Sequence, residues 1–398
     1  MRSISDKLAF LVGSAEILEN IDKLPPFRIF DSTVIEFLSA FSKTLSADQR
    51  TKRYPDVATF AFWCRKASVE SLKKPYADVA NRLGRGVVFH IAPSNVAVNF
   101  AYSLVAGLLA GNANIVRLPS KDFEQVDIIC ETINRSLTEA VRPYICLVRY
   151  ERSEEINAYL SRKCDTRVIW GGDNTIAEIR KAPLKPRANE ICFADRYSMC
   201  VINADKYLEA DNKHIIAQNF YNDTYLSDQN ACTSPRVVVW MGKNVAKAQA
   251  EFWDNLYPVV KEKYALQPAR AVAKLAALYK LAAANEGARR QESVDNLILR
   301  VRVESLNENL MDYLDSCGYF LEYKAENLEE ILPLCGDKLQ TLSYYGVDPA
   351  EIERFVDTFR PKGVDRVVPI GKTMDFSLIW DGYDLIRSMS REVTVSKR

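Results

Sequence analysis

One cysteine, Cys232, stands among small and polar residues directly before an apolar strand. The surrounding run, residues 228–236, reads Asp-Gln-Asn-Ala-Cys-Thr-Ser-Pro-Arg, and Val237 opens the apolar run that follows. A structural cysteine more often lies inside an apolar segment, as Cys130 does. A thiol at the mouth of a strand, among groups that can form hydrogen bonds, is placed to ionise and to meet a substrate. The pattern favours a nucleophile at position 232, against the alternative of one more packing cysteine.

The first of two strand-to-helix turns follows an apolar run that ends at Ile91. The turn contains Ala92, Pro93, Ser94 and Asn95. In a doubly wound sheet, ligands bind at the carboxyl ends of the strands. The Asn95 amide is therefore a candidate donor to a developing oxyanion. The alternative is that Ser94 or Asn95 only caps the helix that follows.

The second turn, residues 170–175, reads Trp-Gly-Gly-Asp-Asn-Thr. Gly171 and Gly172 let a ligand approach the backbone closely, and the amino terminus of the next helix favours a phosphate group. The turn has neither the GxGxxG pattern nor a P-loop motif. The alternative is a tight turn in which Asp173 caps the helix, and the residues leave both interpretations open.

Two histidines and nine cysteines limit the other chemistry of the chain. Two histidines exclude a His-rich metal site, and His90, at the end of an apolar strand, is expected to be a structural residue with satisfied hydrogen bonds. The cysteines include no close CxxC pair, which argues against a disulfide framework and against a zinc ribbon. We therefore expect reduced thiols, no metal and a cytoplasmic protein.

The composition is that of an ordinary globular protein with more than one domain. The chain has 398 residues, of which 48% are hydrophobic and 26% charged, and its net charge is +1. The length predicts two domains, and the nearly cancelling charges give no reason to expect a nucleic-acid surface. The first residues do not read as a signal peptide, and no run of roughly eighteen apolar residues predicts a transmembrane segment.

Alternating strand and helix patterns must position the candidate groups. Residues 1–80 read as helical, and short apolar runs then alternate with helical spacing from residue 86 onward. This alternation predicts an α/β fold with doubly wound parallel sheets. Longer helices follow residue 205, so we divide the chain into domains of residues 1–205 and 206–398, and the last segment can return to the first domain.

An Asn-bearing turn, a Gly-Gly turn and the cysteine, in this order, resemble the aldehyde dehydrogenase superfamily. More narrowly, the chain resembles the acyl-CoA reductase family, the LuxC-type fatty-acid reductases of bacterial bioluminescence. The resemblance covers most of the chain and implies an aldehyde dehydrogenase-like fold of two doubly wound α/β domains with an N-terminal helical segment. Its further landmarks are residues 62–66 (Phe-Trp-Cys-Arg-Lys), 111–120, 195–198 (Asp-Arg-Tyr-Ser), 363–371 and 380–382 (Trp-Asp-Gly).

The resemblance implies a role for each candidate position. Cys232 matches the nucleophile, and Asn95 with the backbone N–H of Cys232 matches the oxyanion hole. Arg117 and Lys121 fall where the adenosine ribose is contacted. Lys121 stands where NAD-preferring relatives have an acid, and it predicts NADPH because a cation can pair with the 2′-phosphate. The residues that match walls of the nicotinamide-cofactor site are Ile91, Ala92, Pro93, Ser94, Gly171 and Gly172.

Cys192 occupies the position of the glutamate with which aldehyde-oxidising relatives activate water. Glu190, two residues earlier, is expected to point elsewhere in an extended segment. Without that base, the chain is predicted to reduce an acyl thioester, first of all a fatty acyl-CoA, to the aldehyde with NADPH through an acyl-enzyme.

Three other functions remain open at this stage. They are a cysteine acyltransferase or thioesterase without hydride transfer, a CoA-independent aldehyde dehydrogenase, and a non-catalytic scaffold. The expected partners are acyl-CoA, an acyl carrier or an acyl-activating enzyme, and the chain is expected to form a homo-oligomer.

Overall fold

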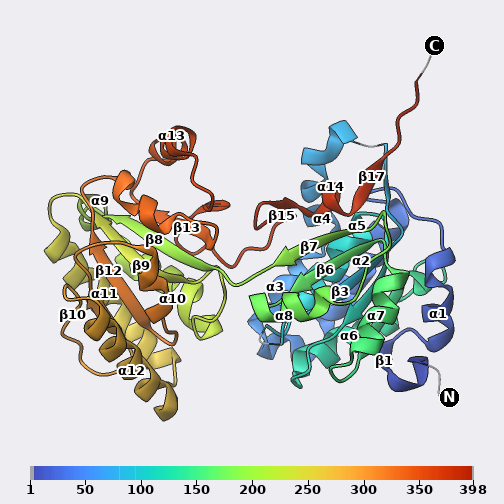
Figure 1. Ribbon diagram of the computed structural model, residues 1–398, viewed down its shortest axis with the longest axis horizontal. Coiled ribbons are helices and arrows are strands. Elements are labelled where there is room, and N and C mark those ends of the chain that lie inside the picture. The colour runs from blue at the N-terminus through green and yellow to red at the C-terminus, as the bar shows by residue number, and fades with distance from the viewer. Residues whose placement is uncertain (1–3, 80, 95, 397–398) are drawn as a thin grey trace. The chain divides into compact units, whose positions relative to one another are not determined.

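The computed structural model describes residues 4–79, 81–94 and 96–396, and the chain divides into two compact units (Figure 1). Unit 1 takes the chain up to Ala194 and again from Phe376, and unit 2 takes Asp195–Asp375. The division falls at residue 195 rather than near residue 205, because β8 (Tyr197–Asn203) already pairs with strands of unit 2.

The final segment of the chain belongs to unit 1. There β17 (Ser390–Glu392) pairs antiparallel with β2 (Arg82–Gly84). Two other short strands of this segment, β15 (Ile379–Trp380) and β16 (Tyr383–Asp384), pair with each other and lead into α14 (Leu385–Ser388).

The sheet of unit 1 has the strand order β1-β5-β4-β3-β6-β7. β1 is antiparallel to β5, and the other neighbouring strands are parallel. The chain winds outward from β3 in both directions, so the topological switch point lies between β3 and β6. The strands are β1 (Ala9–Val12), β3 (Val87–Ile91), β4 (Ala113–Arg117), β5 (Ile145–Arg149), β6 (Thr166–Trp170) and β7 (Asn189–Phe193).

Helices lie between β1 and β3 and connect the strands from β3 onward, as the sequence predicts. The expectation that residues 1–80 are helical is wrong for β1, which pairs with β5 at the edge of the sheet. Every residue of β3 and β6 is buried, as expected for parallel strands that are covered on both faces. The preceding helices are α1 (Ala15–Asn20), α2 (Ser32–Ala47), α3 (Pro55–Trp63) and α4 (Lys66–Lys73), and the connecting helices are α5 (Asn99–Leu109), α6 (Glu124–Ser136), α7 (Glu154–Lys163) and α8 (Asp173–Arg180).

The sheet of unit 2 has the order β10-β11-β12-β9-β8-β13-β14, and its neighbouring strands are parallel except for β10 with β11. With β8, the strands are β9 (Pro235–Met241), β10 (Arg289–Arg290), β11 (Leu299–Arg302), β12 (Tyr319–Lys324), β13 (Leu339–Tyr345) and β14 (Arg366–Pro369).

Alternate residues of β9 enter two different hydrophobic cores. Val237 and Val239 pack in a core with side chains of α12 (Pro268–Ala284) and α13 (Pro349–Phe359). Val238 and Trp240 pack on the other face, with α9 (Ala204–Leu208), α10 (Lys213–Thr224) and α11 (Val245–Lys263). Helices on both faces make this sheet doubly wound, which confirms the predicted fold class.

None of the described helices combines the length and the apolar character that crossing a bilayer requires.

Candidate active site

Three strand ends that carry predicted cofactor residues lie side by side in unit 1. Ile91, the last residue of β3, lies opposite Arg117 of β4 and Ile169 of β6. The Ala92 N–H donates to the Arg117 carbonyl at 3.1 Å, so the first turn continues the edge of the sheet. Because the three strands are parallel, their carboxyl ends meet at one edge, at the switch point where open α/β sheets bind ligands.

The first turn does not cap a helix. α5 has Val98 as its N-cap residue, and no side-chain hydrogen bond is made there. The alternative that Ser94 is an N-cap is therefore wrong. Ser94 is exposed, and Ala92 and Pro93 are half-buried. Asn95 lies outside the described residues, so its assignment as an oxyanion donor stays a prediction.

The second turn presents backbone at the end of β6. Gly172 is the N-cap of α8 and makes no side-chain cap hydrogen bond, and Asp173 is the first helical residue rather than the cap. A Cβ atom on Gly171 would lie 3.0 Å from Cγ2 of Thr175, which is tighter than ordinary van der Waals contact. The first backbone N–H groups of α8 therefore lie at this edge, and the N-cap residue accepts no hydrogen bond from them through a side chain. This arrangement suits a phosphate group.

Two cations flank the same edge. The Arg117 guanidinium lies over the ring of Tyr150, 4.6 Å from its centroid, and Lys121 Nζ lies 5.0 Å from the ring centroid of Phe123. Arg117 is half-buried at the end of β4, and Lys121 is exposed in the loop that leads to α6. The rings orient both cations without neutralising them, so the charges stay available to a phosphate.

His90 is a structural residue, as predicted. Its ring is fully buried, with Nδ1 2.7 Å from Ser103 Oγ and Nε2 2.9 Å from Asn114 Oδ1. Trp170 Nε1 donates to the same serine hydroxyl at 3.0 Å. Burial lowers the pKa of His90 to about 4, so the ring stays neutral. His214 is exposed on α10.

Cys232 lies at the amino-terminal edge of the unit 2 sheet, in the loop that precedes β9. It is half-buried, and so is Cys192, whereas the other cysteines are buried and all are free thiols. Asp228 and Gln229 at the start of the loop have φ values of 51° and 57°, in the left-handed region. Such strain persists only where the surroundings fix it, and it clusters at functional sites.

Gln229 fixes this loop to the neighbouring strand. The side chain is fully buried. Its Oε1 accepts the N–H groups of Gly318 at 2.9 Å and Tyr319 at 3.1 Å. Its Nε2 donates to the carbonyls of Pro235 at 2.9 Å and Tyr319 at 3.1 Å. All four side-chain hydrogen-bonding positions of the amide are therefore used, and the loop is held in one conformation.

Two further contacts hold the loop from other elements. Ser198, at the start of β8, donates through Oγ to the carbonyl of Cys232 at 2.7 Å. Thr233 Oγ1 donates to Sδ of Met374 at 3.3 Å. Contacts with β8, β12 and the segment after β14 thus hold the backbone of Cys232 and the residues on both sides of it.

Sequence reasoning missed Asp223, a buried carboxylate on α10 that fixes the segment before Met374. It accepts the N–H groups of Gly371 at 2.6 Å and Thr373 at 3.2 Å. Burial raises the pKa of Asp223 to about 6. A signal is present in the sequence, because Asp223 stands three residues after Phe220 and so lies on the apolar face of its helix.

Arg236 is a half-buried cation whose charge interacts favourably with that of the Cys232 thiolate. Its Nη2 donates to the carbonyl of Gln229 at 3.1 Å, and its Nε has no hydrogen-bond partner among the described residues. Burial lowers the pKa of Arg236, while the negative charges of Asp315 and the Cys232 thiolate favour the charged guanidinium. By the same interaction, the cation stabilises the thiolate form of Cys232.

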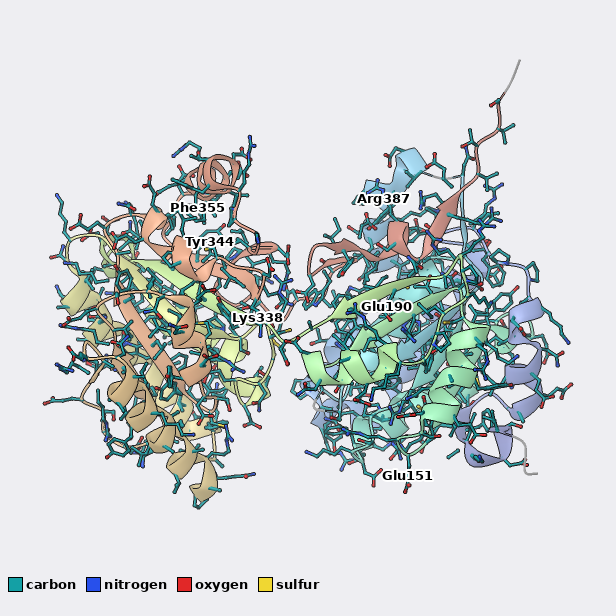
Figure 2. All side chains as sticks on the ribbon, viewed as in Figure 1. Glu151, Glu190, Lys338, Tyr344, Phe355 and Arg387 are labelled. Carbon is teal, nitrogen blue, oxygen red and sulfur yellow. The ribbon has the colours of Figure 1, made fainter. Side chains whose placement is uncertain are left out.

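Glu190 and Cys192 lie on the same face of β7, so the expectation that Glu190 points elsewhere is wrong. Residues i and i+2 of a strand share a face, and Cys192 Sγ donates to Glu190 Oε1 at 3.3 Å. Figure 2 labels Glu190 in unit 1. Its carboxylate is held by Arg167 Nε at 2.7 Å on one oxygen and by Arg180 Nε at 2.7 Å on the other.

Neither residue is set up as a base. Burial opposes ionisation of Glu190, but the hydrogen bonds from Arg180 and Arg167 hold its pKa below the usual value, so it is a fixed anion. Burial, with the nearby Glu190 carboxylate, raises the pKa of Cys192 to about 11, so its thiol stays protonated at neutral pH.

Solved structures of aldehyde dehydrogenases share the fold of this chain. An NAD-dependent aldehyde dehydrogenase from Sinorhizobium meliloti superposes with a TM-score of 0.67 over 98% of this chain and 91% of its own, at 12% identity. The indole-3-acetaldehyde dehydrogenase AldA of P. syringae gives 0.67 over 95% and 85%, at 13% identity. A benzaldehyde dehydrogenase from Corynebacterium glutamicum gives 0.62 over 98% and 95%, at 13% identity. These similarities define the fold class as that of the aldehyde dehydrogenases.

A match to a sequence profile identifies the family to which the chain belongs within this fold class. The profile described as Acyl-CoA reductase (LuxC) matches residues 64–392. The chain therefore belongs to the LuxC acyl-CoA reductase family, which confirms the resemblance of the motifs, and it is an aldehyde-related oxidoreductase. A comparison with curated proteins gives no match.

Proposed function

We propose that this protein reduces an acyl thioester, first of all a fatty acyl-CoA, to the aldehyde with NADPH, through an acyl-enzyme on Cys232. The observation that carries the proposal is the family match over residues 64–392, within which Cys232 stands in a loop held by Gln229 and interacts electrostatically with the cation of Arg236. The scaffold alternative accounts for none of these arrangements, because a non-catalytic chain needs no cation beside this thiol.

In the proposed reaction Cys232 is the nucleophile. Its thiolate attacks the thioester carbonyl carbon, and the carbonyl oxygen takes up the negative charge. When the carbonyl re-forms, the C–S bond to the donor breaks and the donor leaves as a thiolate. Arg236 favours the attacking thiolate, and Gln229 keeps the loop in place. We assign stabilisation of the oxyanion to the Asn95 amide and the Cys232 N–H, following the family resemblance.

The carboxyl edge of the unit 1 sheet fits a nicotinamide cofactor. When bound, the reduced cofactor supplies the hydride that brings the acyl group to the aldehyde level. The residues that would hold it are Ile91 to Ser94, Gly171 and Gly172, with Arg117 and Lys121 for the ribose and the 2′-phosphate. Support comes from a 1-pyrroline-5-carboxylate dehydrogenase from Thermus with bound NAD, which superposes with a TM-score of 0.62 over 94% of this chain and 82% of its own, at 12% identity.

The chemistry at β7 favours reduction over hydrolysis of the acyl-enzyme. Hydrolysis needs a base to activate water, and the family position for that base holds the protonated thiol of Cys192. Glu190 is engaged by Arg167 and Arg180. The acyl-enzyme should therefore survive until it is reduced, or until a thiol takes the acyl group back.

The test is to incubate the protein with acyl-CoAs of increasing chain length, with and without NADPH, and to follow absorbance, aldehyde and intact mass. We expect an acyl adduct without NADPH and aldehyde with it. Cys232→Ala should lose both, whereas Cys192→Ala, at the other half-buried cysteine, should keep the adduct. Thioester cleavage at the same rate without NADPH, with no aldehyde in its presence, would instead identify an acyltransferase or thioesterase.

A further inference from the structure

A basic hollow of about 510 Å³ opens on the surface of unit 1 between α2 and the start of α4. The chemistry above uses none of its residues, although two of them belong to the sequence landmark at residues 62–66. No acidic residue lines the hollow within the described chain. The polar lining residues are Ser39, Ser42, Lys43, Ser46, Arg65 and Lys66.

The α2 side of the hollow is one polar face of a helix. Its lining residues are Ser39, the pair Ser42 and Lys43, and the pair Ser46 and Ala47, and this recurrence at intervals of three or four places them on the same side. Ser42 is buried and donates through Oγ to the carbonyl of Ala61 at 2.6 Å, so it forms the floor. Lys43 and Ser46 are exposed and Ser39 is half-buried, and no hydrogen bond within the described chain engages the two serine hydroxyls.

The α4 side adds the exposed guanidinium of Arg65 and the start of a helix. α4 begins at Lys66 with Arg65 as its N-cap, and no side-chain hydrogen bond caps it. Ser68, in the first turn, donates instead to the carbonyl of Phe62 at 3.0 Å. The Arg65 guanidinium lies 4.5 Å from the ring centroid of Phe62, which orients it. The uncapped first turn adds positive potential to that of the side chains.

The three cations of the hollow have no carboxylate to neutralise them. Within the described residues, Lys43, Arg65 and Lys66 form no ion pair within 4.0 Å. Glu36 and Glu70, each about one turn away along α2 and α4, do not line the hollow. Cations that converge on one hollow repel one another, and an anion with several oxygens removes that repulsion while accepting hydrogen bonds from all of them. A phosphate ester is such an anion.

We propose that this basic hollow binds the phosphate groups of the thioester donor, at the 3′-phosphoadenosine diphosphate end of CoA. The inference rests on the proposed function, since it takes acyl-CoA as the donor. It assigns to Lys43, Arg65 and Lys66 a role in recognising the donor, distinct from the residues proposed for the nicotinamide cofactor. NADPH also carries phosphate groups, so the experiment must distinguish the two sources.

The first measurement is binding by calorimetry, with CoA and adenosine 3′,5′-bisphosphate as ligands. The double variant Lys43→Gln/Lys66→Gln should weaken both roughly tenfold or more, because each substitution removes a charge-assisted contact. Lys73→Gln, an exposed lysine at the far end of α4, is the matched control and should bind like the wild type. NADPH binding should be unchanged in both. Unchanged affinity for the bisphosphate in the double variant would overturn the proposal, and so would an equal loss of NADPH binding.

The second measurement compares two donors in the reductase assay. The double variant should raise KM for acyl-CoA roughly tenfold and leave KM and kcat unchanged for the acyl thioester of N-acetylcysteamine, which has no phosphate. An equal rise of KM for both donors would overturn the proposal. Failure of the proposed function would look different, because the wild type would then form no acyl adduct on Cys232 from either donor.

Discussion

The side chain of Gln229 pairs with the backbone of Tyr319 as a neighbouring strand would. Its Oε1 accepts the Tyr319 N–H at 3.1 Å, and its Nε2 donates to the Tyr319 carbonyl at 3.1 Å. The side chain thus extends the pairing of β9 with β12 at the end next to Cys232. A left-handed turn at Gln229 takes its own backbone out of this pairing, and its amide group restores the lost hydrogen bonds.

Replacing Gln229 with alanine should destabilise the protein and disorder the nucleophile loop. Gly318 N–H and the two main-chain groups of Tyr319 would lose their buried partner, and we expect the free energy of unfolding to fall by about 2–4 kcal/mol. Urea denaturation measures it. Asn230→Ala, at the exposed next residue, is the control and should change stability by less than about 0.5 kcal/mol. A Gln229→Ala protein as stable as this control would show that the hydrogen bonds of the Gln229 side chain do not stabilise the loop.

The alternation of strands and helices could be predicted because the residue pattern of each element lies within its own short segment. β3, β4 and β6 are short apolar runs followed by turn residues, and the helices between them show the spacing of a buried face. The boundary near residue 205 was placed too late, because it relied on helix length. β8 belongs to unit 2 because it pairs with β9, which begins at Pro235, and with β13, which begins at Leu339, and pairing between such separated segments leaves no local signal.

The sequence indicates candidate site residues where the signal is the residue type at a turn, and it gives no indication of contacts between distant segments. Cys232 and Gly171 stand out by their neighbours in the sequence. The hydrogen bond that the Gly371 N–H donates to Asp223 joins segments far apart in the chain. The orientation of Glu190 was missed for another reason: the period of two in a strand already places it on the face of Cys192.

Asp223 should make stability depend on pH between about 4 and 6. Its pKa in the folded protein, about 6, lies above the ordinary 3.8, so the folded state holds this proton to higher pH than the unfolded state does. The free energy of unfolding therefore falls as pH rises through this window, by up to about 3 kcal/mol for this group. Asp375 lies close enough to add repulsion once both are charged.

The measurement is denaturant unfolding of the wild type and Asp223→Asn at several values of pH. The amide cannot titrate, so the wild type should lose stability relative to the variant between pH 4 and pH 7 and keep a constant difference above that. Asp375→Asn, at the exposed neighbour, should keep most of the pH dependence. A difference between wild type and Asp223→Asn that does not change with pH would show that Asp223 is ionised throughout.

Lys121 should determine the preference between the two nicotinamide cofactors. An exposed cation beyond the end of β4 can pair with the 2′-phosphate of NADPH, whereas a carboxylate there would repel it. We expect the wild type to use NADPH with a lower KM than NADH, and Lys121→Glu to reverse this order by raising KM for NADPH roughly tenfold or more. Steady-state kinetics with both cofactors measure it, with Lys52→Glu, an exposed lysine of the same unit, as the control. Equal use of both cofactors by the wild type would show that Lys121 does not determine a preference for NADPH.

Aldehyde oxidation should depend on CoA, because the thiol of Cys192 does not activate water to hydrolyse the acyl-enzyme. A positioned base speeds the attack of water on an acyl-enzyme by roughly 10²–10⁴. The Cys192 thiol, with a pKa of about 11, is protonated at neutral pH and cannot supply this base, and Glu190 is held by two arginines. With aldehyde and NADP⁺, the wild type should therefore form acyl-CoA when CoA is present and almost no free acid when it is absent.

Restoring a carboxylate at this position tests the argument directly. Cys192→Glu should raise the CoA-independent release of carboxylic acid at least about tenfold, below the full effect of an evolved base, because the new side chain lies beside the Glu190 carboxylate. Cys192→Gln has the same size and no basic oxygen, so it should stay at the wild-type level. Arg180, whose side chain is largely exposed, can pair with the added carboxylate and keep it ionised. Brisk acid release by the wild type without CoA would show that another group activates water, and that the chain oxidises aldehydes like its structural neighbours.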